Sequence, residues 1–109
     1  MTDGLKPKHR RAIIEALSAN PKVEKIVLFG SRATGTFTPA SDVDIALFGK
    51  ELTLSDQAEL SERISELPIP QRVDILIYHR IGNKALIEHI QKHGIEWFSR
   101  ESENIKSCI

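Results

Sequence analysis

The sequence predicts an α/β (α+β) domain in which a small mixed β-sheet has its helices packed on one face. Two observations predict it. Three short apolar runs have the length and residue types of strands, and the segments around them have helical periodicity. The expected order is helix, strand, loop, strand, helix, strand, helix, which is typical of a layer of helices on a sheet. At 109 residues, we expect one domain over 1–109, with a core from about 8 to 98 and a loose tail over 102–109.

The three expected helices are identified by the spacing of their apolar residues. They cover residues 8–20, 55–67 and 83–94. Pro68 follows the second helix and cannot continue it, because proline has no amide hydrogen. Gly94 is the expected C-cap of the third.

The three expected strands cover residues 25–29, 42–48 and 72–78. The first is a continuous apolar run, which indicates a strand buried on both faces. The second alternates before it turns apolar. Between these two strands, residues 32–40 are rich in glycine, proline and threonine, which predicts a short helical turn followed by a loop. Residues 95–98 are expected to form a short extended or docking segment.

Composition excludes several classes of protein. Fifteen basic and fifteen acidic residues cancel, so direct binding to nucleic acid is not expected. No apolar stretch approaches the roughly 20 residues of a membrane-spanning helix, and the N-terminal residues do not resemble a secretory signal. The single cysteine, Cys108, rules out an internal disulfide and suits a reducing compartment. We therefore expect a cytoplasmic protein with no membrane association.

Three aspartates are candidates for a catalytic and metal-binding site. Asp42 and Asp44 lie two apart at the start of the second strand, and Asp74 lies within the third. Because side chains alternate across a sheet, all three are expected on the face opposite to the neighbouring valines and isoleucines. If the two strands are neighbours, the three carboxylates come within several ångströms of one another.

Three clustered carboxylates repel one another unless a cation lies between them. Mg²⁺ accepts a few carboxylates together with phosphate oxygens of a substrate. Two such ions, roughly 3.5–4 Å apart, can stabilise both the attacking and the leaving oxygen of an in-line displacement. The cluster therefore predicts metal-dependent phosphoryl or nucleotidyl transfer.

A glycine–serine pair directly after the first strand is a candidate phosphate-binding turn. Gly30 permits a close approach of the backbone and a positive φ, and Ser31 adds a hydroxyl donor. If residues 31–35 form a helical turn, their free amide groups can face an anion. Arg32 or Lys25 could add positive charge. The pair is not a P-loop, which needs a longer glycine-rich loop that ends in Gly-Lys-Ser/Thr.

Together these motifs resemble the minimal nucleotidyltransferases of the DNA polymerase β-like superfamily. The signature of that family is Gly-Ser, about ten residues, Asp-x-Asp and a later strand aspartate. Gly30–Ser31, Asp42–Val43–Asp44 and Asp74 match it in this chain. The segments around these residues are similar to the small prokaryotic members encoded beside HEPN-domain toxins.

The resemblance implies the nucleotidyltransferase fold and a role for each residue of the signature. Asp42 and Asp44 would coordinate two Mg²⁺ ions, which Mn²⁺ could replace. Asp74 would bind the catalytic metal and help to deprotonate the acceptor, while Gly30 and Ser31 would hold the phosphates of ATP or another nucleoside triphosphate. One departure concerns Thr34, since many relatives carry a second basic residue there.

The resemblance also implies an activity and a partner. MNT-type antitoxins transfer AMP to a tyrosine of a HEPN toxin. The short chain leaves little surface to enclose an acceptor, so a partner chain or self-association into a homo-oligomer is expected. Two alternatives remain open: a non-catalytic antitoxin that neutralises its partner by binding, and a small-molecule nucleotidyltransferase.

His89 and His93 lie four apart on the last expected helix, a spacing that can hold zinc. No third ligand accompanies them in a recognisable pattern, and cationic residues near a helix C-terminus are favourable in any case. A structural role is therefore the expected one.

Overall fold

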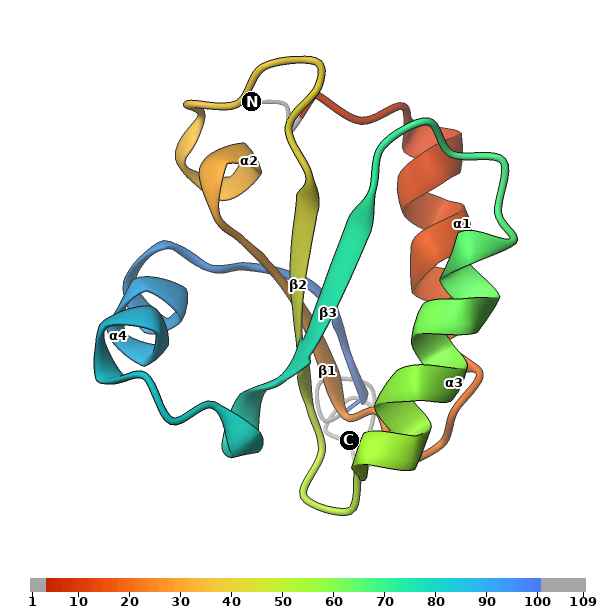
Figure 1. Cartoon of the computed structure of the whole chain (residues 1–109), viewed down its shortest axis with the longest axis vertical. Coiled ribbons are helices and arrows are strands. Elements are labelled where there is room, and N and C mark those ends of the chain that lie inside the picture. The colour runs from red at the N-terminus through yellow and green to blue at the C-terminus, as the bar shows by residue number, and fades with distance from the viewer. Residues whose placement is uncertain (1–3, 101–109) are drawn as a thin grey trace, which may run out of the picture.

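The computed structural model describes residues 4–100, in which helices surround a four-stranded sheet (Figure 1). The elements in chain order are α1 (Pro7–Ser18), β1 (Lys25–Phe29), α2 (Ser31–Thr34), β2 (Val43–Phe48), α3 (Leu54–Ser65), β3 (Val73–Ile77), a 3₁₀ turn (Tyr78–Arg80), α4 (Lys84–His93) and β4 (Ile95–Ser99). The predicted α/β class and element order are confirmed. The tail expected over 102–109 lies outside the described residues.

The sheet is mixed, as predicted, with the strand order β3-β2-β1-β4. β1 is antiparallel to both β2 and β4, whereas β2 and β3 run parallel. A parallel pair needs a crossover connection, and α3 supplies it between β2 and β3. The segment expected to be extended over 95–98 is β4, an edge strand.

The main core lies between the sheet and the pair α1 and α3. Ile13 and Leu17 of α1 and Leu60 and Ile64 of α3 are buried there. The residues that the strands contribute to this core are Ile26, Leu28, Val43, Ile45, Leu47, Ile75 and Ile77. Those of β2 and β3 are the alternate positions that the sequence pattern assigned to the face away from the aspartates.

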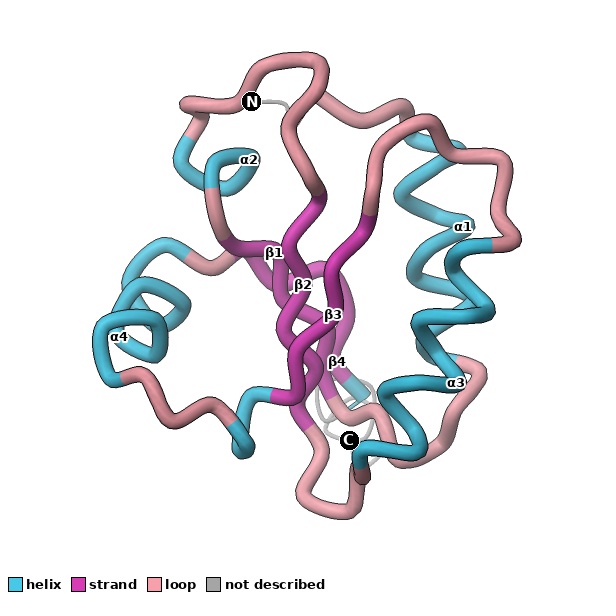
Figure 2. The backbone as a smooth tube through the Cα atoms, viewed as in Figure 1, coloured by secondary structure: helices cyan, strands magenta, loops and turns pink. Residues whose placement is uncertain are grey.

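The expectation that the helices pack on one face of the sheet is wrong for α4. Figure 2 shows α1 and α3 on one side of the strands and α4 on the other. Val27, Phe29 and Ala46 form a second, smaller core with Ile90 of α4. The physical reason lies in the sequence of β1, which is apolar at consecutive positions. A strand that is apolar on both faces needs cover on both.

Local signals set the helix boundaries to within a few residues of the prediction. Pro7 occupies the first turn of α1, where its missing amide hydrogen is not needed. Thr53 and Asp56 form a capping box at the start of α3. Gly94 caps α4 as expected, but with φ −62° and ψ 141°, so the chain passes directly into β4. Within residues 4–100, no helix is both long and apolar enough to cross a membrane.

Candidate active site

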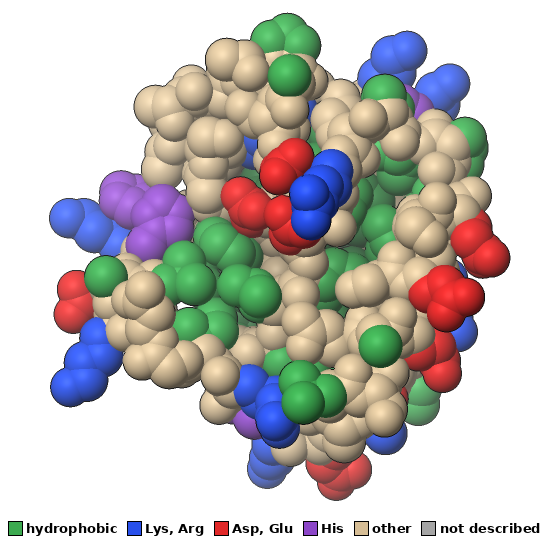
Figure 3. All heavy atoms as spheres, in the orientation of Figure 1, with side chains coloured by type: hydrophobic (Ala, Val, Ile, Leu, Met, Phe, Trp, Pro, Cys, Tyr) green, Lys and Arg blue, Asp and Glu red, His purple; other side chains and the backbone are tan. Residues whose placement is uncertain are grey.

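The three predicted aspartates gather where β2 and β3 begin, on the α4 face of the sheet. Asp44 and Asp74 are partners in the parallel register of the two strands. Asp42 comes two residues before Asp44 and is exposed just ahead of β2. The condition set by the sequence, that the two strands be neighbours, is met. In Figure 3, acidic side chains gather near the middle of the visible face.

The surroundings of Asp44 raise the pKa of its carboxyl group. Partial burial raises the pKa of Asp44 above its usual value, and the negative charges of Asp74 and Asp42 raise it further. A positive charge on His89 would act in the opposite direction. The site therefore has an excess of negative charge, as expected for residues that receive a cation.

One arginine lies against the carboxylates. The Nε of Arg72 is 3.3 Å from Oδ1 of Asp74. The two side chains are 77% and 43% exposed, so the pair contributes little to stability. Sequence reasoning missed Arg72. Its position could have indicated the contact, because Arg72 lies two residues before the strand residue Asp74 and alternate side chains of a strand share a face.

The glycine–serine turn lies at the end of β1, beside Asp44. Gly30 has φ 79° and ψ −159°, which only glycine adopts readily, and a β-carbon there would collide with the carboxylate of Asp44. Ser31 begins α2, and its side-chain hydroxyl has no hydrogen-bond partner among residues 4–100. That hydroxyl is therefore available to a ligand next to the carboxylates.

The structure places Arg32 away from the open side of the turn. Its side chain is 1% exposed, and its Nε and Nη2 donate to the carbonyl of Ser41 at 3.2 and 2.9 Å. Nη2 also donates to the carbonyl of Pro39 at 3.3 Å. Arg32 thus ties α2 to the loop that leads into Asp42. Lys25 lies at the other end of β1, with Nζ 4.7 Å from the centre of the Phe48 ring.

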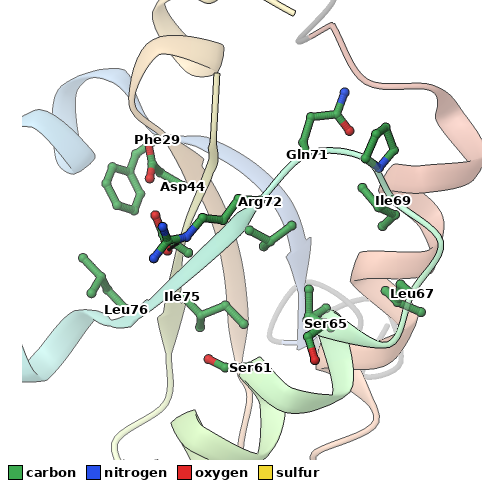
Figure 4. A pocket seen from close by; sticks show the side chains of 14 residues that line it. Phe29, Asp44, Ser61, Ser65, Leu67, Ile69, Gln71, Arg72, Ile75 and Leu76 are labelled. Carbon is green, nitrogen blue, oxygen red and sulfur yellow. Dashed lines mark ion pairs between the residues drawn. The ribbon is translucent and has the colours of Figure 1, made fainter. Parts of the chain in front are cut away.

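A cleft of about 840 Å³ opens along β3 and reaches Asp44 and Asp74. This volume is within the roughly 300–1,000 Å³ of sites for small ligands. Figure 4 shows Asp44, Arg72 and Leu76 on one side of β3, with Ser61 and Ile75 on the other. The cleft therefore extends around the free edge of the sheet from the carboxylates toward the C-terminal end of α3.

His89 of α4 is the second residue whose place sequence reasoning missed. Its Nε2 accepts a hydrogen bond of 3.0 Å from the amide of Gly30, 59 residues away in the chain. The imidazole rings of His89 and His93 are 5.2 Å apart. The four-residue spacing reflects their positions on one face of α4, and no sequence signal links His89 to Gly30.

The chemistry of the site fits divalent cations, although no preformed cage is visible. Within residues 4–100, no group of three His, Cys, Asp or Glu side chains is placed closely enough to hold a metal by itself. Mg²⁺ does not need one, because it usually retains several waters and takes one or two carboxylates together with substrate phosphates. Burial and the negative charges of Asp74 and Asp42 raise the pKa of Asp44, and such ions would favour its ionised form.

These features form a candidate transferase site, and comparison with known proteins shows the family of the chain. The family described as "Polymerase beta, Nucleotidyltransferase" matches residues 11–103. The chain belongs to this family, and it is a nucleotidyltransferase.

The relatives that resemble the chain include one curated protein and several complexes. The protein adenylyltransferase homologue MJ0141 of Methanocaldococcus jannaschii is 28% identical over 78 residues, which cover 69% of this chain and 79% of the relative. A toxin–antitoxin structure with AMP-PNP has a TM-score of 0.70 and 26% identity over 88% of this chain and 78% of the other. The MNT antitoxin complex with a tri-AMPylated HEPN toxin of Shewanella oneidensis has the same fold, with a TM-score of 0.68 and 22% identity over 92% and 77% of the two chains.

Proposed function

We propose that this nucleotidyltransferase moves AMP from ATP to a tyrosine hydroxyl of a HEPN-type toxin partner and thereby acts as a cytoplasmic antitoxin. The observation that carries the proposal is the register of β2 and β3, which sets Asp44 opposite Asp74 beside the Gly30–Ser31 turn. The likeness to a protein adenylyltransferase homologue supports AMP as the transferred group. The likeness to a toxin–antitoxin structure with AMP-PNP supports an ATP-binding antitoxin.

Each residue of the site has a proposed role. Asp42, Asp44 and Asp74 would hold two Mg²⁺ ions, and Mn²⁺ could replace them. When bound, the ions would neutralise charge on the attacking and leaving oxygens. Ser31 and the backbone of the turn would hold the β- and γ-phosphates, which orients the α-phosphorus toward the acceptor. A contact of Arg32 with phosphate stays a prediction from the sequence. In the structure its guanidinium is buried against loop carbonyls.

The transfer itself is a substitution at the α-phosphorus. The acceptor oxygen forms a bond to that phosphorus, the bond from the α-phosphorus to the bridging oxygen breaks, and pyrophosphate leaves. The proton of the acceptor hydroxyl would pass to Asp74, which borders the open cleft. The cleft beside Asp74 gives a side chain of another protein a route to the site.

Intact mass spectrometry would test the proposal. The purified chain is incubated with Mg²⁺, ATP and the protein encoded beside its gene, and both proteins are then weighed. We expect the partner to gain one or more AMP units, and we expect Asp42→Asn to abolish the gain. Glu62→Gln is the matched control, because it removes a carboxylate from an exposed position on α3.

Other results would point to the alternatives. A partner that stays unmodified in a tight complex, and that Asp42→Asn still neutralises, would favour a non-catalytic antitoxin. ATP turnover without modification of the partner would indicate another acceptor, such as a small molecule.

A further inference from the structure

Among residues 4–100, one hydrogen bond connects α4 to the glycine–serine turn. The amide of Gly30 donates to Nε2 of His89 at 3.0 Å. Because the amide can only donate, Nε2 must be the acceptor, and the imidazole carries its proton on Nδ1 when neutral. Of the two histidines on α4, His89 is half-buried and makes this bond, whereas His93 is exposed.

This bond restrains the peptide group between Phe29 and Gly30. The carbonyl of Gly30 is already held, because it accepts from the amides of Ala33 at 3.0 Å and Thr34 at 3.2 Å. The α-carbon of Gly30 faces the carboxylate of Asp44. His89 restrains the remaining polar group of this residue, its amide hydrogen. The backbone at φ 79° is therefore fixed from three directions.

His89 is itself held in place by packing. Its ring meets the ring of Phe29 edge to face, with centres 6.2 Å apart and planes at 76°. The next residue, Ile90, is buried against the second core. The α4 helix begins with Asn83, whose side chain accepts from the amides of Ala85 and Leu86. The imidazole is therefore carried by a helix that is capped at its N-terminus and packed against the sheet, as expected for a residue that positions others.

We propose that His89 is a positioning residue of the nucleotidyl-transfer site: it holds the Gly30 amide so that Ser31 faces the triphosphate of the nucleotide. The inference rests on the proposed function, which places the β- and γ-phosphates at this turn. His89 does not touch the reacting atoms in this role. It acts through the orientation of Gly30, and thus through the placement of the Ser31 hydroxyl.

Three variants separate this role from a general contribution to folding. His89→Leu removes the acceptor and keeps an apolar side chain of moderate size. His89→Gln restores an acceptor, because its amide oxygen lies about as far along the side chain as Nε2. His93→Leu is the matched control one turn away. Leucine and glutamine are both good helix formers, so α4 is expected to persist in all three.

The first measurement is calorimetric binding of the unreactive analogue α,β-methylene-ATP with Mg²⁺, together with the KM for ATP and kcat for AMP transfer to the partner protein. We expect His89→Leu to weaken analogue binding and raise KM by about tenfold or more, since a shift of about 1 Å in a site can cost roughly 100-fold. His89→Gln should recover most of the loss, and His93→Leu should match wild type.

The second measurement is the amide resonance of Gly30 in ¹H–¹⁵N spectra of the nucleotide-free protein. We expect His89→Leu to shift this resonance and to speed its exchange with solvent, and His89→Gln to restore slow exchange. If wild type binds the analogue and folded His89→Leu binds it equally well, the positioning role is wrong. If wild type itself does not bind the analogue, the nucleotide site in the proposed function is wrong, and this inference falls with it.

Discussion

Two carboxylate sites in this small chain have opposite electrostatic character. At the start of α3, Asp56 accepts from the amide and the hydroxyl of Thr53 at 2.9 and 3.0 Å and pairs with Lys22 at 3.1 Å. The hydrogen bond from the Thr53 backbone, followed by that from Lys22, lowers the pKa of Asp56 to about 2. At the start of β2, burial and two like charges raise the pKa of Asp44 instead.

The difference separates a carboxylate that caps a helix from one that we propose to be functional. Asp56 accepts from the amide of the N-cap residue Thr53 and lies in the first turn of α3, so its charge stabilises the fold. Asp44 is partly buried beside Asp74 and Asp42, and both the burial and the like charges disfavour its ionised form. Carboxylates whose pKa is raised by burial and like charges are found most often at binding and catalytic sites. The comparison therefore predicts opposite responses to cations, mutation and pH.

The largest expected effect is stabilisation by a divalent cation. If Mg²⁺ binds only the folded chain, a concentration about 100 times its Kd raises the free energy of unfolding by about 2.7 kcal/mol. Thermal unfolding at increasing Mg²⁺ would measure this shift. We expect Asp74→Asn to abolish most of it, because the variant removes one of the three carboxylates.

Asp56→Asn supplies the matched control for the cation experiment. It removes a carboxylate that is already paired, so the rise in melting temperature with Mg²⁺ should equal that of wild type. An equal rise in wild type and Asp74→Asn would show that the cations do not bind at the carboxylate cluster.

A smaller loss of stability is expected when the capping box at the start of α3 is removed. Thr53→Ala removes the side chain that accepts from the amide of Asp56. Loss of such a cap costs about 1 kcal/mol in the free energy of unfolding. Urea unfolding would measure it, with Thr36→Ala as the control, because that threonine is exposed in a loop and caps no helix. A cost equal to that of the control would mean that the capping box does not stabilise α3.

Much of the candidate site follows from local pattern. Alternation along the strands assigned Asp44 and Asp74 to one face, and the glycine at the end of β1 suggested a positive φ, which the structure shows. These features depend on neighbours in sequence, so they can be inferred without knowing the sheet order. That β2 and β3 are neighbours was a condition of the prediction, and neither this nor their parallel pairing could be derived from local pattern.

What sequence reasoning missed depends on contacts between distant segments. The apolar run of β1 indicated that both faces of the sheet are covered, but not which element covers the second face. That α4 does so follows from where the chain crosses after the 3₁₀ turn. The contact of His89 with Gly30 follows from that crossing. Arg32 was predicted to contact phosphate from its place beside the turn. Carbonyls of the folded loop over 36–41 accept from its guanidinium, and no local signal predicted that contact.

The pH dependence of stability distinguishes the two sites most finely. For Asp56, the folded pKa of about 2 lies below the ordinary value of 3.8. Its contribution to stability is therefore complete above 3.8 and is lost as the pH falls through about 2. For Asp44 the sign is reversed. Its folded pKa lies above 3.8, so the ionised carboxylate lowers stability at neutral pH, and that cost disappears as the pH falls toward 3.8.

Unfolding curves of two variants in chelator, from neutral to acidic pH, would test both signs. We expect Asp56→Asn to be less stable than wild type at neutral pH, with a difference that shrinks below 3.8. We expect Asp44→Asn to be more stable than wild type at neutral pH, with a difference that shrinks as Asp44 becomes protonated. The gain should be modest, because Asp44 is only partly buried. If Asp44→Asn were less stable than wild type without cations, the carboxylate would be making a favourable contact, and the contrast between the two sites would not hold.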